Sequence, residues 1–164
     1  MYRYLAFYMM LSFLACTSVE TSSISFQLLQ PKQTNITFEN TITESDSVNL
    51  FDYYYIYNGS GVAVGDVNND DRWDLFIAND FGVNELFVQQ PDGSFLDKAI
   101  EYGVDADGND MGMAIGDYDN NGVYDYYITN IAENRLFTFN GQDYDNLASG
   151  LNVLKTYWAW DARF

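Results

Sequence analysis

The sequence predicts an all-β chain that forms part of a β-propeller, with about two four-stranded blades and the start of a third. Two observations lead to this fold class. A nine-residue acidic loop occurs twice, beginning at Asp66 and at Asp117, and strand-like apolar segments flank both copies. The two loops begin 51 residues apart, and each repeat contains about four short strands separated by turns, which is the content of one propeller blade. A single sheet cannot bury both of its faces, so two such units are expected to stack.

The composition indicates a folded, strongly acidic protein. Of 164 residues, 24 are acidic and 7 are basic, and the net charge of −17 makes direct binding to nucleic acid phosphates unfavourable. The 48% hydrophobic and 18% aromatic content is too high for a disordered acidic chain. No histidine is present, which removes the commonest general base and a common zinc ligand. The single cysteine, Cys16, excludes an internal disulfide.

Residues 1–16 are predicted to be a lipoprotein signal peptide. Arg3 precedes an apolar run of about a dozen residues, which is too short to span a membrane. The run ends at Leu14-Ala15-Cys16, which resembles the lipobox of bacterial lipoproteins and predicts cleavage before Cys16 and lipid attachment to it. The alternatives are an ordinary secretory signal and a buried first helix with a core cysteine. We therefore expect an exported outer-membrane or cell-surface lipoprotein, or a secreted protein, with membrane contact only through the anchor.

Two segments are expected between the signal peptide and the first repeat. Residues 17–35 are rich in Ser, Thr and Gln and predict a tether. Residues 36–60 are expected to form leading strands, because residues 36–38 and 50–57 have strand-like patterns before an Asn58-Gly59 turn. The tyrosines at 53–57 are interpreted as one face of a strand, and an exposed platform that stacks against sugars is the alternative.

Residues 61–110 and 111–155 are predicted to be two repeats, each with its own calcium loop. In each loop, oxygen-bearing side chains occupy positions one, three, five and nine, and a backbone carbonyl at position seven can join them. This spacing lets a curled loop turn the oxygens toward one point, and such a set suits Ca²⁺ better than Mg²⁺. An acidic turn that binds no ion is the alternative. The expected ligands are Asp66, Asn68, Asp70, the Arg72 carbonyl and Asp74 in site 1, and Asp117, Asp119, Asn121, the Val123 carbonyl and Asp125 in site 2.

The two loops do not fit the EF-hand pattern. An EF-hand places a bidentate Glu at position twelve between two helices, whereas position twelve here is Ile77 in the first loop and Ile128 in the second. The segments before and after each loop alternate or run apolar, as strands do. The predicted architecture is therefore a loop between two strands.

Residues 156–164 are predicted to be the first strand of a truncated third repeat. Ala162-Arg163-Phe164 falls in register with Val62-Ala63-Val64, and a third loop would begin just beyond the last residue. The natural protein is therefore expected to continue past this point. The alternative is a genuine C-terminus whose tryptophans cap the core.

The two loops with their flanking strands resemble the FG-GAP/VCBS repeat family, whose calcium loop also occurs in integrin α-chain propellers. Residues 55–70 are similar to bacterial exported repeat proteins of the type associated with ASPIC/UnbV domains. The resemblance implies a seven-bladed propeller that binds calcium through the ligands given above and acts in surface binding or assembly. Asp71 departs from the pattern, because glycine usually makes the sharp turn there, so site 1 is expected to bind more weakly. Gly122 keeps the pattern in site 2.

The expected function is non-catalytic. We expect a calcium-binding propeller segment of an exported bacterial surface lipoprotein, which binds a surface protein or a glycan in adhesion. Two alternatives remain open, namely part of a propeller-based polysaccharide-degrading enzyme and a purely structural spacer. Metal ligation accounts for the clustered acids, and no further Asp/Glu pair stands out as a catalytic pair.

Overall fold

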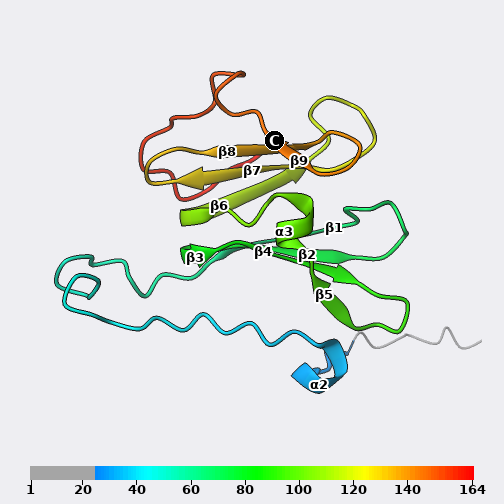
Figure 1. Cartoon of the computed structure of the whole chain (residues 1–164), viewed down its shortest axis with the longest axis horizontal. Coiled ribbons are helices and arrows are strands. Elements are labelled where there is room, and N and C mark those ends of the chain that lie inside the picture. The colour runs from blue at the N-terminus through cyan, green and yellow to red at the C-terminus, as the bar shows by residue number, and fades with distance from the viewer. Residues whose placement is uncertain (1–24) are drawn as a thin grey trace, which may run out of the picture.

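The computed structural model describes residues 25–164 and has an all-β fold, which confirms the predicted fold class (Figure 1). The predicted signal peptide, with Cys16, and the first part of the predicted tether lie outside these residues. Within the described part, both helices have four residues, and neither could cross a membrane. The elements are α2 (Pro31–Thr34), β1 (Gly61–Gly65), β2 (Asp74–Ala78), β3 (Asp80–Val83), β4 (Glu85–Gln89), β5 (Phe95–Asp97), α3 (Ala99–Tyr102), β6 (Asp107–Gly116), β7 (Asp125–Asn130), β8 (Arg135–Phe139) and β9 (Tyr144–Asn146).

The strands form two antiparallel sheets. The first sheet, which we call blade 1, has the order β1-β2-β4-β5. The second has the order β3-β6-β7-β8-β9, and we call its last four strands blade 2. In blade 1 the pairing of β1 with β2 ends at Gly65 opposite Asp74, and in blade 2 the pairing of β6 with β7 ends at Gly116 opposite Asp125. Each acidic loop therefore closes a pair of neighbouring strands, as the sequence predicts.

The strand β3 connects the two repeats. It follows β2 in the chain but pairs with β6, with Asp80 opposite Asn109. β6 is ten residues long; its residues 107–109 pair with β3, and its pairing with β7 begins at Asp110 opposite Asn130, with a register shift between Asp110 and Met113. Main-chain hydrogen bonds therefore cross from the first repeat to the second, which the sequence did not predict.

The hydrophobic core lies between the two sheets, which stack on each other (Figure 1). Phe76 on β2 and Tyr126 on β7 are both 1% exposed, and their rings meet edge to face with centroids 4.9 Å apart. Leu86 on β4 and Phe137 on β8 belong to the same cluster. Full burial of such a side chain contributes about 1.5–3 kcal/mol, so packing between the blades is a major source of stability.

The leading strands predicted for residues 36–60 are not formed. This segment has turns and bends, and Ile56 is its one fully buried hydrophobic side chain. One reason is local, because the Asn49 side-chain oxygen accepts hydrogen bonds from the backbone N–H groups of Phe51 and Asp52, which bends the chain. Tyr54 is 77% exposed and Tyr57 is 62% exposed, so the interpretation of these tyrosines as a strand face is also wrong.

Residues 156–164, predicted as the first strand of a third repeat, also contain no strand. Trp158 and Trp160 stack on each other, and Tyr55 packs edge-on against both, with ring centroids 5.2 and 5.4 Å away. The segment nevertheless lies along β6, since a Cβ atom added to Gly112 would come within 2.6 Å of the Asp161 Cα atom. A strand needs a hydrogen-bonded neighbour, and no described segment pairs with these residues.

Candidate metal centre

Each acidic loop curls in the same way around its first aspartate. In the second loop, the Asn121 and Gly122 N–H groups donate to the two Asp117 carboxylate oxygens, each at 2.9 Å. In the first loop, the Asp70 and Asp71 N–H groups donate to Asp66 at 3.0 and 2.8 Å. The shared pattern shows that sequence repeats with the same spacing adopt the same local fold.

Left-handed backbone conformations close both loops. The fourth position has φ 56° at Asn69 and φ 60° at Asn120, and asparagine tolerates this region well. The sixth position has φ 65° at Asp71 and φ 87° at Gly122. A left-handed residue other than glycine costs roughly 1–2 kcal/mol. Asp71, which stands where glycine is usual, therefore strains the first loop without preventing its closure.

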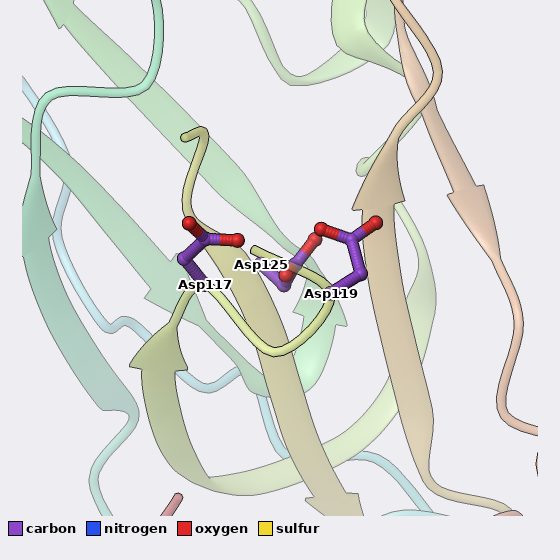
Figure 2. Close-up of side chains that lie close together, drawn as sticks. All are labelled: Asp117, Asp119 and Asp125. Carbon is purple, nitrogen blue, oxygen red and sulfur yellow. The ribbon is translucent and has the colours of Figure 1, made fainter. Parts of the chain in front are cut away.

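The second loop gathers three carboxylates at one point (Figure 2). Oxygen atoms of Asp117, Asp119 and Asp125 all lie within 4.8 Å of one another, and no other group of three such residues in 25–164 does so. Asp125 begins β7 and is fully buried, whereas Asp119 lies exposed in the loop. Three like charges at this spacing repel one another unless a cation lies between them.

Asp125 has an unsatisfied oxygen in this cluster. Its Oδ2 atom accepts a hydrogen bond from the Tyr118 N–H group at 2.9 Å, but its buried Oδ1 atom has no partner among the described residues. Burial raises the pKa of Asp125 and the negative charges of Asp119 and Asp117 add to the rise, whereas the Tyr118 N–H group and the nearby Thr138 hydroxyl oppose it. A buried polar atom without a partner is costly, and a bound cation would satisfy it and lower the cost of the ionised form.

The remaining predicted ligands of the second loop make contacts within the loop. Asn121 Oδ1 accepts from the Val123 N–H group at 2.7 Å, and the Asn121 amide Nδ2 donates to Asp119 at 3.1 Å. The amide hydrogen therefore points at a carboxylate that a cation would otherwise contact. The donor set fits a hard cation, because every expected ligand supplies an oxygen, although Asn121 must turn its oxygen inward.

The first loop is satisfied by its own protein contacts. Both oxygens of Asp74 accept hydrogen bonds, from the N–H groups of Val67 at 2.9 Å and Gln89 at 2.8 Å. The Arg72 guanidinium pairs with Asp70, and Asn68 Nδ2 also donates to Asp70 at 2.8 Å. A protein cation thus pairs with one of the carboxylates that a metal ion would contact. The sequence predicts only the Arg72 carbonyl as a ligand, although an Arg two residues after an Asp is a visible signal for this pair.

A pocket of about 470 Å³ lies between the two loops. Its lining includes Asp66 and Asp117, the first residues of the two loops, together with Trp73 and Tyr124 from the eighth positions. The Trp73 side chain is 62% exposed. The structure therefore brings the two predicted sites to the same end of the neighbouring blades.

A second buried polar cluster lies between the repeats, and sequence reasoning missed it. Asp110 on β6 is fully buried and accepts hydrogen bonds from Asn84 Nδ2 at 2.8 Å and Asn130 Nδ2 at 2.7 Å. The Arg135 Nε atom lies 3.0 Å from Asp110 Oδ2 and pairs with it. These partners come from both repeats, and no local motif marks them, because they lie 20 to 26 residues from Asp110.

In comparisons with known proteins, one family match covers both acidic loops. Residues 66–128 match the family described as FG-GAP-like repeat, which supports the resemblance found in the sequence. The chain is 37% identical over 73 residues to cartilage acidic protein 1 of Xenopus tropicalis and 36% identical over 73 residues to that of Homo sapiens. These alignments cover 44% of this chain and 11% of each relative. The chain thus spans about a tenth of the length of the curated relatives it matches.

Proposed function

Taking as premise that residues 66–128 match an FG-GAP-like repeat in a β-propeller-like fold, we propose that this chain is a calcium-binding propeller segment. The observation that carries the proposal is the buried Asp125 Oδ1 atom, which lacks a partner beside the carboxylates of Asp117 and Asp119. The family match and the relatives favour a non-enzymatic repeat domain over an enzyme. Calcium in this role is structural and stabilises the junction between neighbouring strands.

Site 2 is the stronger of the two proposed calcium sites. Its ligands are the Asp117, Asp119, Asn121 and Asp125 side chains and the Val123 carbonyl. The ion supplies positive charge to three clustered carboxylates and a partner to the unsatisfied Asp125 oxygen. Because the unfolded chain holds no such cluster, metal binding is coupled to folding. Calcium fits better than magnesium, since the loop offers many oxygens in a flexible arrangement.

Site 1 is proposed to bind calcium more weakly. Its ligands are Asp66, Asn68, Asp70, Asp74 and the Arg72 carbonyl. An entering ion must displace the Arg72 guanidinium from Asp70 and weaken the two backbone hydrogen bonds that Asp74 accepts. The left-handed Asp71 adds strain to the same loop. These three contacts give a physical reason for a difference in affinity between two loops of equal spacing.

The cellular role that we propose is surface attachment. The chain belongs to an exported bacterial lipoprotein anchored through Cys16, and it binds a surface protein or a glycan in adhesion. What supports the anchor is the Leu14-Ala15-Cys16 sequence after a short apolar run. Mass spectrometry of the membrane fraction should find an acylated Cys16 at the mature N-terminus, and Cys16→Ser should abolish the acylation. A mature N-terminus at any other residue would contradict the anchor without bearing on calcium.

Calcium titration of the full chain by isothermal calorimetry tests the metal proposal. We expect one tighter and one weaker binding event and a higher melting temperature in calcium than in chelator. Asp117→Asn with Asp125→Asn should remove the tighter event, because it removes two charged ligands. The matched variant Asp66→Asn with Asp74→Asn should remove only the weaker one. Identical melting curves with calcium and with chelator would refute calcium binding.

A further inference from the structure

The loop of site 2 contains an asparagine followed by a glycine, Asn121-Gly122, the dipeptide in which asparagine deamidates most readily. In this reaction the backbone nitrogen of the glycine attacks the side-chain carbonyl carbon of the asparagine, and the missing Cβ atom leaves room for the attack. Both residues are exposed, and a Cβ atom added to Gly122 would have no atom within 4 Å. The segment thus has the space and the access to water that the reaction needs.

Three hydrogen bonds hold the reacting groups of this segment. The Gly122 N–H group donates to Asp117 Oδ2 at 2.9 Å, so a carboxylate lies where the proton of the attacking nitrogen must go. The Val123 N–H group donates to Asn121 Oδ1 at 2.7 Å, and this oxygen gains negative charge when the nitrogen adds to the carbon beside it. Asn121 Nδ2, the nitrogen that leaves, donates to Asp119 at 3.1 Å. The loop therefore has an acceptor for the proton and a donor for the developing negative charge.

Two other asparagine–glycine pairs in the chain allow a comparison. The Asn140 side-chain oxygen also accepts hydrogen bonds from two backbone N–H groups, those of Gln142 and Asp143. The Gly141 N–H group, however, makes no hydrogen bond within residues 25–164. At Asn58 the buried Nδ2 atom has no partner in the same part of the chain. Of the three pairs, only the one in site 2 has a carboxylate on the glycine N–H group.

We propose that Asn121 is a deamidation site that bound calcium protects. The Gly122 nitrogen forms a bond to Asn121 Cγ, and the Cγ–Nδ2 bond breaks. The proton of the Gly122 N–H group passes to the Asp117 carboxylate and then to the departing nitrogen, which leaves as ammonia. Water opens the resulting cyclic imide at either of its carbonyl carbons, which gives aspartate or isoaspartate at position 121.

Calcium acts against the contacts that favour this reaction. An ion held by the ligands given above takes the carboxylates of Asp117 and Asp119 and the side-chain oxygen of Asn121. The Asp117 carboxylate then accepts the Gly122 proton less readily, because it shares its charge with the ion. The Asn121 side chain is also no longer free to turn toward the Gly122 nitrogen. This protection rests on the proposed function, whereas the modification of the metal-free loop does not.

Both products of the reaction change site 2. Aspartate gives the loop a fourth carboxylate, at the fifth position, where site 1 has Asp70. Isoaspartate adds one carbon to the main chain between the fifth and sixth positions, which shifts Asp125 relative to the ligands that precede it. Since neither product returns to asparagine, a period without calcium alters the site permanently.

Peptide mass spectrometry tests this proposal on the full chain, incubated in detergent at neutral pH with calcium or with chelator. The three pairs fall in separate tryptic peptides, 33–72, 99–135 and 136–155. In chelator we expect Asn121 to deamidate several times faster than Asn140. Calcium at about ten times its dissociation constant leaves about one loop in eleven free, so it should slow the reaction of Asn121 about tenfold. The other two pairs should react at the same rate in both buffers.

Asp117→Asn isolates the contact with the glycine N–H group. The new amide oxygen can accept the same hydrogen bond but takes up a proton far less readily, so in chelator Asn121 should slow to about the rate of Asn140. An unchanged rate in this variant, equal rates of Asn121 and Asn140 in wild type, or calcium binding at site 2 without protection would each overturn the proposal. If circular dichroism shows that the variant does not fold, the two wild-type comparisons decide.

Calorimetry separates this proposal from the proposed function. If no calcium binds at site 2, the proposed function fails, and faster reaction of Asn121 than of Asn140 in chelator still establishes the modification site. If calcium binds but Asn121 reacts no faster than Asn140 in chelator, the modification site fails and the calcium site stands.

Discussion

Two aspartates at the ninth position of the loops have different environments. Asp74 and Asp125 are both buried and both accept a hydrogen bond from a backbone N–H group in their own loop, at 2.9 Å. Asp74 accepts a second one from Gln89 on β4, and Asp125 receives no equivalent bond from the described residues. Burial raises the pKa of both carboxyls. The missing bond is what leaves site 2 with an oxygen for a metal ion.

Asp80 provides a residue-scale prediction about pH. It is 1% exposed, its Oδ2 atom has no partner within residues 25–164, and burial raises its pKa, with the Asp110 charge adding to the rise. A carboxyl whose pKa is higher in the folded state disfavours folding when it is ionised. Its free-energy penalty is therefore full at neutral pH, begins to fall as the pH drops through the folded pKa, and is gone below the unfolded pKa. Asp80→Asn should therefore stabilise the protein at pH 7 by about 1 kcal/mol and flatten the pH dependence between the unfolded pKa and the raised one.

Urea unfolding in chelator from pH 4 to pH 8 measures this effect. Asp92→Asn is the opposite control, because Ser94 donates hydrogen bonds to the exposed Asp92 and lowers its pKa, so its contribution favours folding at neutral pH. We expect that variant to be less stable than wild type at pH 7 and to remain less stable at pH 4, because the lowered pKa of Asp92 lies below pH 4. A loss of stability at pH 7 in Asp80→Asn would show that the ionised carboxylate is needed there.

At the scale of elements, each loop depends on how its sixth residue turns. Asp71 and Gly122 both lie in the left-handed region, but only the aspartate has a Cβ atom, which makes this conformation sterically strained. The turn does not use the Asp71 side chain, since only its N–H group bonds to Asp66. The strain is therefore removable without loss of a contact.

Substitution of each of these two residues by the other tests how much the sixth residue strains its loop. Asp71→Gly should raise stability in chelator by about 1 kcal/mol, the lower limit for relief of a left-handed side chain, and should tighten calcium binding at site 1. Gly122→Asp should lower stability by a similar amount and weaken site 2. Thermal melts with and without calcium measure both changes. An Asp71→Gly protein with a lower melting temperature would show that the aspartate side chain stabilises the loop.

At the scale of the whole molecule, Asp110 joins the two repeats. It is the acceptor for side chains of Asn84, Asn130 and Arg135, while β3 adds main-chain pairing to the first half of β6. A buried carboxylate with this many donors is satisfied in place, and removing it leaves Arg135 without its partner. We expect the two blades to unfold as one unit because of this shared network.

Asp110→Ala is the prediction at this scale. It should cost about 3–5 kcal/mol, because two buried asparagine donors and the partly buried Arg135 lose their acceptor and the arginine charge is left uncompensated. Urea unfolding followed by tyrosine and tryptophan fluorescence measures the change. The control is Glu133→Ala, which removes an exposed pair with Lys155 at 3.6 Å and should cost well under about 1 kcal/mol. A cost for Asp110→Ala as small as the control would show that the repeats are joined by apolar packing alone.

Short-range sequence patterns were enough to predict the repeats. Alternating apolar residues on either side of each loop predicted β1, β2, β6 and β7, and the structure brings three of the predicted ligands, Asp117, Asp119 and Asp125, close together. The same patterns failed for residues 36–60, because a strand-like sequence forms a strand only where another strand pairs with it. They also missed the Arg72 side chain in the first loop, whose charge competes for Asp70.

The amino-acid sequence by itself determined the all-β class, the two loops and the residues that could bind a cation, since these depend on neighbours within about ten positions. Tertiary structure alone decided that β3 crosses to β6, that Asp110 meets Arg135, and that residues 160–164 lie against Gly112 and Gly116 of β6. The physical reason is that pairing and burial depend on surfaces brought together from distant parts of the chain, and no local pattern specifies which surfaces those are.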